Sequence, residues 1–212
     1  MCVNAKTAGL RIRIGALALS LCLLASQNAS AFSYPLQGEE IREAYFLGRT
    51  TNNEKLTDFF KRYVHEFPFP DRGPYFSYVE SVEFRTPYEQ VVLRSRQNLN
   101  QYSSLEAEKD YQTQPNLVVV GVLISYMISY VGPERPTSSF KIRVSQSDAI
   151  EPKKLTTESI CSVSWHSDCG VTRFALFLSF DAEQFTSGNV RIEVATPDGQ
   201  NLQTEFDLDN LM

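Results

Sequence analysis

The second half of the chain alternates between apolar and polar residues, and this period of two predicts β-strands. Strands are expected over residues 140–145, 172–180, 190–194 and 202–208. Residues 196–199 read Thr-Pro-Asp-Gly and predict a turn between the last two. The apolar run 117–131 is longer than a usual strand of about 3–10 residues, so we expect it to bend, with a bulge at Gly121.

The first half shows the longer period of amphipathic helices. One helix is expected over 39–47, with Gly48 at its end. In the next, Thr51 and Glu54 have capping-box spacing and an apolar stripe follows, formed by Leu56, Phe59, Phe60, Tyr63, Val64 and Phe67.

Two further helices are marked by their first residues. Thr86 is the expected N-cap of one, Pro87 fits its first position, and Glu89 has capping-box spacing. A weaker helix is expected over 104–112, with Ser103 as its cap.

A strand is expected over 76–85, with most of its larger apolar side chains on one face. Glu80 falls on that same face and does not fit the pattern. It is the one acid whose placement suggests a raised pKa, and we expect it to pair with an arginine.

The pattern changes near Pro115, which we take as a domain boundary. The sequence therefore predicts an α+β protein, in which a helical region 32–115 packs on an antiparallel β-sandwich over 116–212. An immunoglobulin-like sandwich is one form of this fold, although the Cys…Trp…Cys spacing of antibody domains is absent.

Residues 1–31 have the three parts of an export signal. Lys6, Arg11 and Arg13 precede a short apolar run, and Ala29-Ser30-Ala31 predicts cleavage after Ala31. The run has roughly 12 residues, fewer than the ~20 that span a bilayer, although an uncleaved anchor is the alternative. We expect the mature chain to reside in the periplasm or outside the cell.

Composition supports a folded protein, because 42% of the residues are hydrophobic and 21% are charged. The full chain has a formal net charge of -5, and removing the three positive residues of the signal leaves 17 positive and 25 negative residues, a net charge of -8. No basic excess points to nucleic acid. Residues 117–131 favour a strand, so no transmembrane span is expected in the mature chain.

Cys161 and Cys169 are the two cysteines that remain after cleavage, and an oxidising compartment favours a disulfide between them. The alternative is a metal-binding protein in which Cys161, His166 and Cys169 hold zinc, with Asp168 as a fourth ligand. That spacing matches no strong zinc signature, so no metal or other cofactor is expected.

No catalytic residues are assigned from the sequence. The two histidines, His65 and His166, do not fall in a Gly-x-Ser-x-Gly or similar nucleophile motif, and no phosphate-binding loop is present. A secreted hydrolase acting on glycans or esters remains the alternative function, because many carboxylate pairs are available.

Aromatic residues surround the prolines of segment 67–76. Phe67, Phe69, Tyr75 and Phe76 form either a binding surface for sugar or peptide, or rings that close one end of the core. Arg85, Arg94 and Arg96 form either a positive spot for an anionic group or a solvated face.

Two segments resemble a family of uncharacterised secreted proteins from environmental bacteria, of acidobacterial type. They are Glu-Ala-Tyr-Phe-Leu-Gly-Arg at 43–49 and Thr-Pro-Tyr-Glu-Gln-Val-Val-Leu-Arg-Ser-Arg at 86–96, and the likeness covers the region 39–130. That family has no assigned activity and no defined site residues. The resemblance implies export from a bacterial cell and gives no residue a role.

The sequence thus predicts an exported, non-enzymatic envelope or secreted protein that binds another macromolecule or a cell-envelope component, or serves as a structural part. Sandwiches commonly act as binding scaffolds, which supports the binding alternative.

The cysteine prediction can be tested on protein recovered after export. Thiol titration of the denatured chain should find no free cysteine, and metal analysis should find no stoichiometric zinc, because the pair is expected to be oxidised. Stoichiometric zinc together with two free thiols would contradict the disulfide.

Overall fold

The computed structural model describes residues 32–69, 77–99, 102–114, 116–126, 139–161 and 172–211. The chain divides into the units Met1–Ser30 and Ala31–Met212, and every described residue belongs to the second. The sites predicted at Ala31, Tyr75, Phe76, His166 and Cys169 lie outside the described residues.

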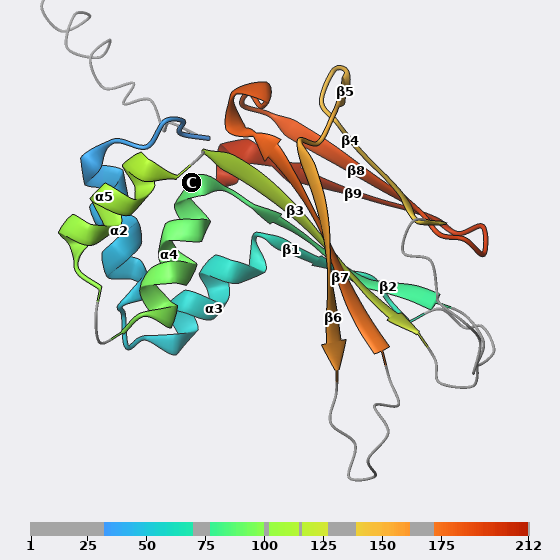
Figure 1. The fold of residues 1–212 in the computed structure, drawn as a ribbon, viewed down its shortest axis with the longest axis horizontal. Coiled ribbons are helices and arrows are strands. Elements are labelled where there is room, and N and C mark those ends of the chain that lie inside the picture. The colour runs from blue at the N-terminus through green and yellow to red at the C-terminus, as the bar shows by residue number, and fades with distance from the viewer. Residues whose placement is uncertain are drawn as a thin grey trace, which may run out of the picture. The chain divides into compact units, whose positions relative to one another are not determined.

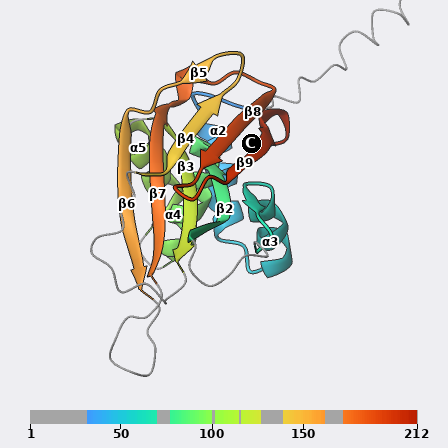
Figure 2. The same cartoon turned by 90° about the vertical axis from the view of Figure 1, so that its right-hand side faces the viewer.

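Two antiparallel sheets form the β part of the protein (Figures 1 and 2). The five-stranded sheet has the order β1-β2-β3-β7-β6, and the four-stranded sheet has the order β5-β4-β8-β9. The strands are β1 (Val64–Glu66), β2 (Ser77–Arg85), β3 (Leu117–Tyr126), β4 (Lys141–Ser145), β5 (Ala149–Ile150), β6 (Lys154–Cys161), β7 (Thr172–Asp181), β8 (Asn189–Ala195) and β9 (Asn201–Asp207).

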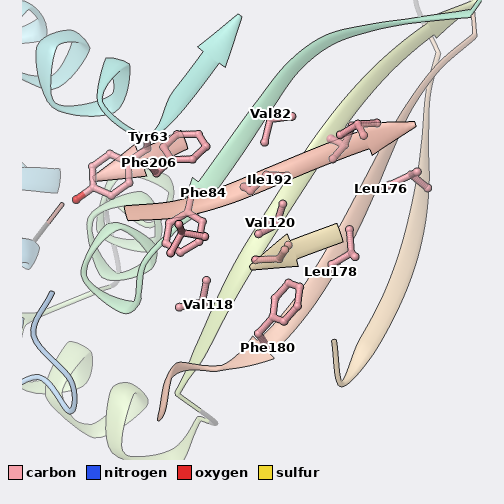
Figure 3. Close-up of a cluster of buried hydrophobic side chains, with 14 of the residues drawn as sticks. Tyr63, Val82, Phe84, Val118, Val120, Leu176, Leu178, Phe180, Ile192 and Phe206 are labelled. Atoms are coloured by element: carbon pink, nitrogen blue, oxygen red, sulfur yellow. The ribbon is translucent and has the colours of Figure 1, made fainter. Parts of the chain in front are cut away.

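One hydrophobic cluster takes side chains from both sheets (Figure 3). Val120 of β3 and Ile192 of β8 are fully buried in it, and the ring of Phe84 on β2 stacks on that of Phe206 on β9 at 5.6 Å. Burying these apolar faces together removes them from water, which is the main favourable contribution to folding.

Four helices belong to the described part of the chain: α2 (Gly38–Gly48), α3 (Asn53–Lys61), α4 (Pro87–Gln97) and α5 (Ser104–Thr113). They enclose a second hydrophobic cluster with Ile41, Ala44 and Val92 at its centre. Phe59 of α3 packs against both clusters and so joins the helices to the sheets. The α+β class is therefore confirmed.

Polar caps fix where the helices begin. The backbone N–H of Glu89 donates to Thr86 Oγ1 at 3.2 Å, and that of Glu106 donates to Ser103 Oγ at 3.3 Å, which confirms both predicted caps. At α3 the cap is Asn52, whose Oδ1 accepts from the N–H of Lys55 at 3.0 Å. The prediction of Thr51 was wrong by one residue.

The apolar stripe predicted as one long helix is also divided. Helix α3 ends at Lys61, and Val64–Glu66 form strand β1. The N–H of Phe84 donates to the carbonyl of Tyr63 at 2.8 Å, because β1 pairs with β2. Sheet pairing overrides the helical period there.

The β-bulge of the five-stranded sheet lies in β2 rather than at Gly121. Val79 pairs with Ile124 and Ser81 pairs with Leu123, so Glu80 is the extra residue. The bulge shifts the alternation by one position and keeps Glu80 off the core face. Glu80 therefore no longer conflicts with the pattern.

Gly121 stays in register, opposite Glu83 on β2 and Phe177 on β7. A Cβ at this position would lie 3.2 Å from Cε1 of Phe177, so glycine lets that ring lie close to the strand. The predicted bulge at Gly121 is wrong, because both ladders pass through this residue without a register shift, and the close approach of the Phe177 ring accounts for the glycine.

The five-stranded sheet takes strands from both sides of residue 115. Strands β1 and β2 precede it, and β2 pairs with β3, which follows it. The predicted domain boundary near Pro115 stays a prediction.

Gly48 allows α2 and α4 to pack closely. A Cβ there would overlap the carbonyl oxygen of Val92 and lie 2.8 Å from Cβ of Ser95. At Gly38, in the first turn of the same helix, a Cβ would have its nearest neighbour at 3.6 Å, in the guanidinium of Arg42.

Replacing Gly48 by alanine should therefore lower the free energy of unfolding by about 1–3 kcal/mol, because the helices must move apart. Denaturant unfolding measures this. Gly38→Ala is the matched control and should not destabilise, since alanine fits there. Equal effects of the two variants would contradict the close approach.

Candidate functional site

The predicted aromatic surface is divided by the structure. Phe67 is half-buried and packs against the hydrophobic cluster between the two sheets, with its ring 4.7 Å from that of His65. Phe69 is 56% exposed and lies edge-on to Tyr78 at 4.8 Å. Phe67 therefore follows the core alternative, whereas Phe69 is exposed and packs on the half-buried Tyr78 of β2.

Glu80 is paired, as the sequence predicts. Nε–H of Arg173 donates to Glu80 Oε1 at 2.9 Å, and the hydroxyl of Ser125 donates to the same oxygen. Both partners reach it because β2 and β7 flank β3. Glu80 is held by these contacts as a structural side chain.

The three arginines predicted as a positive spot have separate partners. Arg85 pairs with Glu83 at 2.5 Å, Arg94 lies 4.0 Å from Asp110, and Arg96 donates to the carbonyl of Thr50 at 3.3 Å. The carboxylates offset the charge of two of them, and the third helps to hold the start of α3.

At the junction of β2 with α4, the ion pair of Arg85 with Glu83 lies near the carboxyl group of Glu89. The guanidinium of Arg85 lies 5.1 Å from the centre of the Phe177 ring, in a cation–π geometry. Glu89 is fully buried, and neither of its carboxylate oxygens has a hydrogen-bond partner among the described residues.

The pKa of Glu89 is raised from 4.5 to about 9, chiefly by burial. The carboxylate of Glu83 contributes to this shift, and Arg85 partly opposes it. Glu89 is therefore protonated at neutral pH. Because its carboxyl oxygens make no hydrogen bond to any described residue, the predicted capping box is not formed. As a buried neutral acid it has no contact with solvent through which to meet a substrate.

A groove of about 830 Å³ lies along α2 and α3. Its apolar floor includes Leu47, Phe59 and Tyr88. The Phe59 ring lies 6.1 Å from that of Tyr88 and 4.9 Å from that of Tyr63, so an aromatic cluster supports the floor. Rings held in this way give a rigid apolar surface.

Phe46 lines the same groove and is 64% exposed. Its ring packs edge-on against that of Tyr45 at 5.2 Å. Tyr45 belongs, with Ile41 and Ala44, to the buried side of α2. Phe46 thus presents a large apolar side chain to solvent beside an apolar floor, which is typical of a binding surface.

The rim of the groove carries charges of both signs. Glu43, Glu54 and Asp58 are acidic, and Lys55 and Arg62 are basic. All five side chains are exposed. Mixed charges suit a partner that carries both signs, such as a polypeptide, better than a polyanion.

Tyr88 lines the groove and carries a phenolic hydroxyl. Burial raises its pKa to about 12, with a further contribution from the carboxylates of Glu43 and Glu40. Its hydroxyl is therefore protonated at neutral pH and can donate a hydrogen bond to a carbonyl.

Sequence reasoning missed this groove. The signal for it was Phe46, an aromatic residue outside the buried stripe of its helix. The other lining residues come from α2, from the segment between α2 and α3, and from α3 and α4, and the packing of the helices brings them together.

Within the described residues, no three His, Cys, Asp or Glu side chains gather where they could hold a metal ion. His166, Asp168 and Cys169 lie outside those residues, and only the backbone of Cys161 is described, at the end of β6. The disulfide and the zinc alternative both stay predictions. Across the described ranges, no helix is long and apolar enough to cross a bilayer.

Comparisons with protein-family models, with curated proteins and with solved structures found no match for this chain.

The raised pKa of Glu89 predicts a pH dependence of stability. The folded state keeps a proton that the unfolded state loses above pH 4.5, so the free energy of unfolding should fall as pH rises from about 4.5 to 9. Its slope would be at most ~1.4 kcal/mol per pH unit.

Denaturant unfolding of Glu89→Gln at a series of pH values measures this contribution. The neutral variant should lose this slope and gain stability relative to the parent as pH rises. Glu66→Gln, on the exposed face of β1, is the control and should keep the parent slope. An unchanged slope in Glu89→Gln would contradict a protonated Glu89.

Proposed function

We propose that this chain is an exported, non-enzymatic binding protein of the bacterial envelope or extracellular space, and that the groove on α2 and α3 takes a segment of another polypeptide. The observation that carries the proposal is the exposed ring of Phe46 beside the aromatic floor. Export is inferred from the pattern of residues 1–31.

The chemistry of the groove favours a peptide with an apolar anchor. The floor offers rings on which an aliphatic or aromatic side chain can pack, and Tyr88 offers a donor for a backbone carbonyl. The rim offers both acidic and basic partners for flanking residues. A buried apolar anchor with a polar rim is the usual distribution of a protein interface.

The two sheets act as the scaffold in this proposal. We infer that they form a β-sandwich, because their apolar faces share one cluster, and the immunoglobulin-like form stays within this inference. The helices that carry the groove are joined to that scaffold through Phe59.

Selection of peptides from a displayed random library, with the exported protein as the target, tests the function. Selected peptides should contain an apolar anchor, and Phe46→Ala should weaken their binding about tenfold, because an aromatic contact of this kind contributes on the order of 1–2 kcal/mol. Isothermal titration measures the affinity.

Leu105→Ala is the matched control, because Leu105 is 74% exposed on α5 and does not line the groove. It should bind like the parent. Equal losses in both variants, or peptides that do not compete with one another, would contradict the groove. Hydrolysis of a glycan or ester substrate that is lost in His166→Ala would contradict the non-enzymatic function.

A further inference from the structure

Strand β6 ends the five-stranded sheet and, among the described residues, pairs only with β7. An edge strand presents backbone N–H and carbonyl groups that can pair with another strand. Leu155 of β6 is 55% exposed, whereas Leu178, its partner across the ladder on β7, is buried. This edge therefore combines backbone groups with an exposed apolar side chain.

Three side chains of β6 share one face of the sheet. Lys154 pairs with Ser179, Thr156 with Phe177 and Glu158 with Ala175. Residues of this face alternate with Leu155 and Thr157, which point to the other face. A positive and a negative side chain thus stand at equal distances on either side of Thr156.

Pairing of β6 with a second copy of itself is governed by symmetry. A two-fold axis that continues the sheet keeps each face on the same side, so residues of one face pair only with residues of that face. An axis at Thr156 is the arrangement that places Lys154 opposite Glu158 of the second copy. The same operation places Glu158 opposite Lys154, so two ion pairs form.

We propose that β6 pairs antiparallel with β6 of a second copy of this chain, with Thr156 on the two-fold axis. Opposite charges directly across an antiparallel pair stabilise it, and like charges destabilise it. On the other face, Leu155 lies opposite Thr157 of the second copy, which covers part of its exposed surface. Pro152 has no N–H to donate and limits the pairing to the region around Thr156.

This proposal is independent of the groove, because β6 and the groove share no residues. The binding of peptides and the association of copies can therefore succeed or fail separately.

Sedimentation equilibrium of the mature exported protein, over a range of concentrations, tests the proposal. The parent should form a reversible dimer. Lys154→Glu and Glu158→Lys should each weaken the dimer about tenfold or more, because each variant places like charges opposite one another twice.

The two variants together provide the sharper test. An equimolar mixture of Lys154→Glu with Glu158→Lys should form a heterodimer with close to the parent affinity, since one edge is then wholly negative and the other wholly positive. The double variant that carries both changes should also regain the parent affinity. Lys109→Glu, on the exposed face of α5, is the control and should leave the dimer unchanged.

Three results would overturn the proposal. They are a parent that stays monomeric at its highest soluble concentration, single variants that associate like the parent, and a mixture that forms no heterodimer. Circular dichroism spectra of the variants identify any loss of folding. Glu158→Lys places a new positive charge near Arg85, whose charge interacts with Glu158, whereas Lys154→Glu does not.

Discussion

The packing of β3 between its neighbours determines most of this structure. On either side it pairs with β2 and β7, and its face toward the four-stranded sheet carries Val118, Val120, Val122 and Ile124, all fully buried. A strand with this many buried apolar residues fixes the register of both neighbours, because a slip by one residue would move them to the other face. The bulge at Glu80 keeps β2 in agreement with that register along its whole length.

The same strand register brings several polar side chains around this sheet to their partners. Glu80 leaves the core face and meets Arg173 and Ser125, and Glu83 meets Arg85 beside the ring that covers Gly121. Some buried polar atoms have no hydrogen-bond partner among the described residues, namely Arg85 Nε, Asn116 Oδ1 and both carboxyl oxygens of Glu89, and Glu89 is the one acid among them. The fold accommodates it by keeping it neutral, which removes most of the cost of burying a charge.

Local patterns in the sequence predicted the elements whose signal lies within a few residues. The caps at Thr86 and Ser103 and the alternation in β4, β7, β8 and β9 belong to this group. Strand β6 was missed because Thr156-Thr157-Glu158-Ser159 is polar and forms a strand only by pairing with β7. The bulge was assigned to Gly121 because glycine is the local signal, whereas the cause lies in the pairing of β2 with β3. The groove could not be predicted because its floor combines residues from three helices.

The neutral state of Glu89 changes how the charge of this protein is counted. The formal value of -5 at pH 7 treats every acid as ionised, so the folded chain carries one negative charge fewer than that count. Refolding at neutral pH consequently withdraws a hydrogen ion from the surrounding buffer. The heat of refolding will therefore vary with the ionisation enthalpy of the buffer that supplies it.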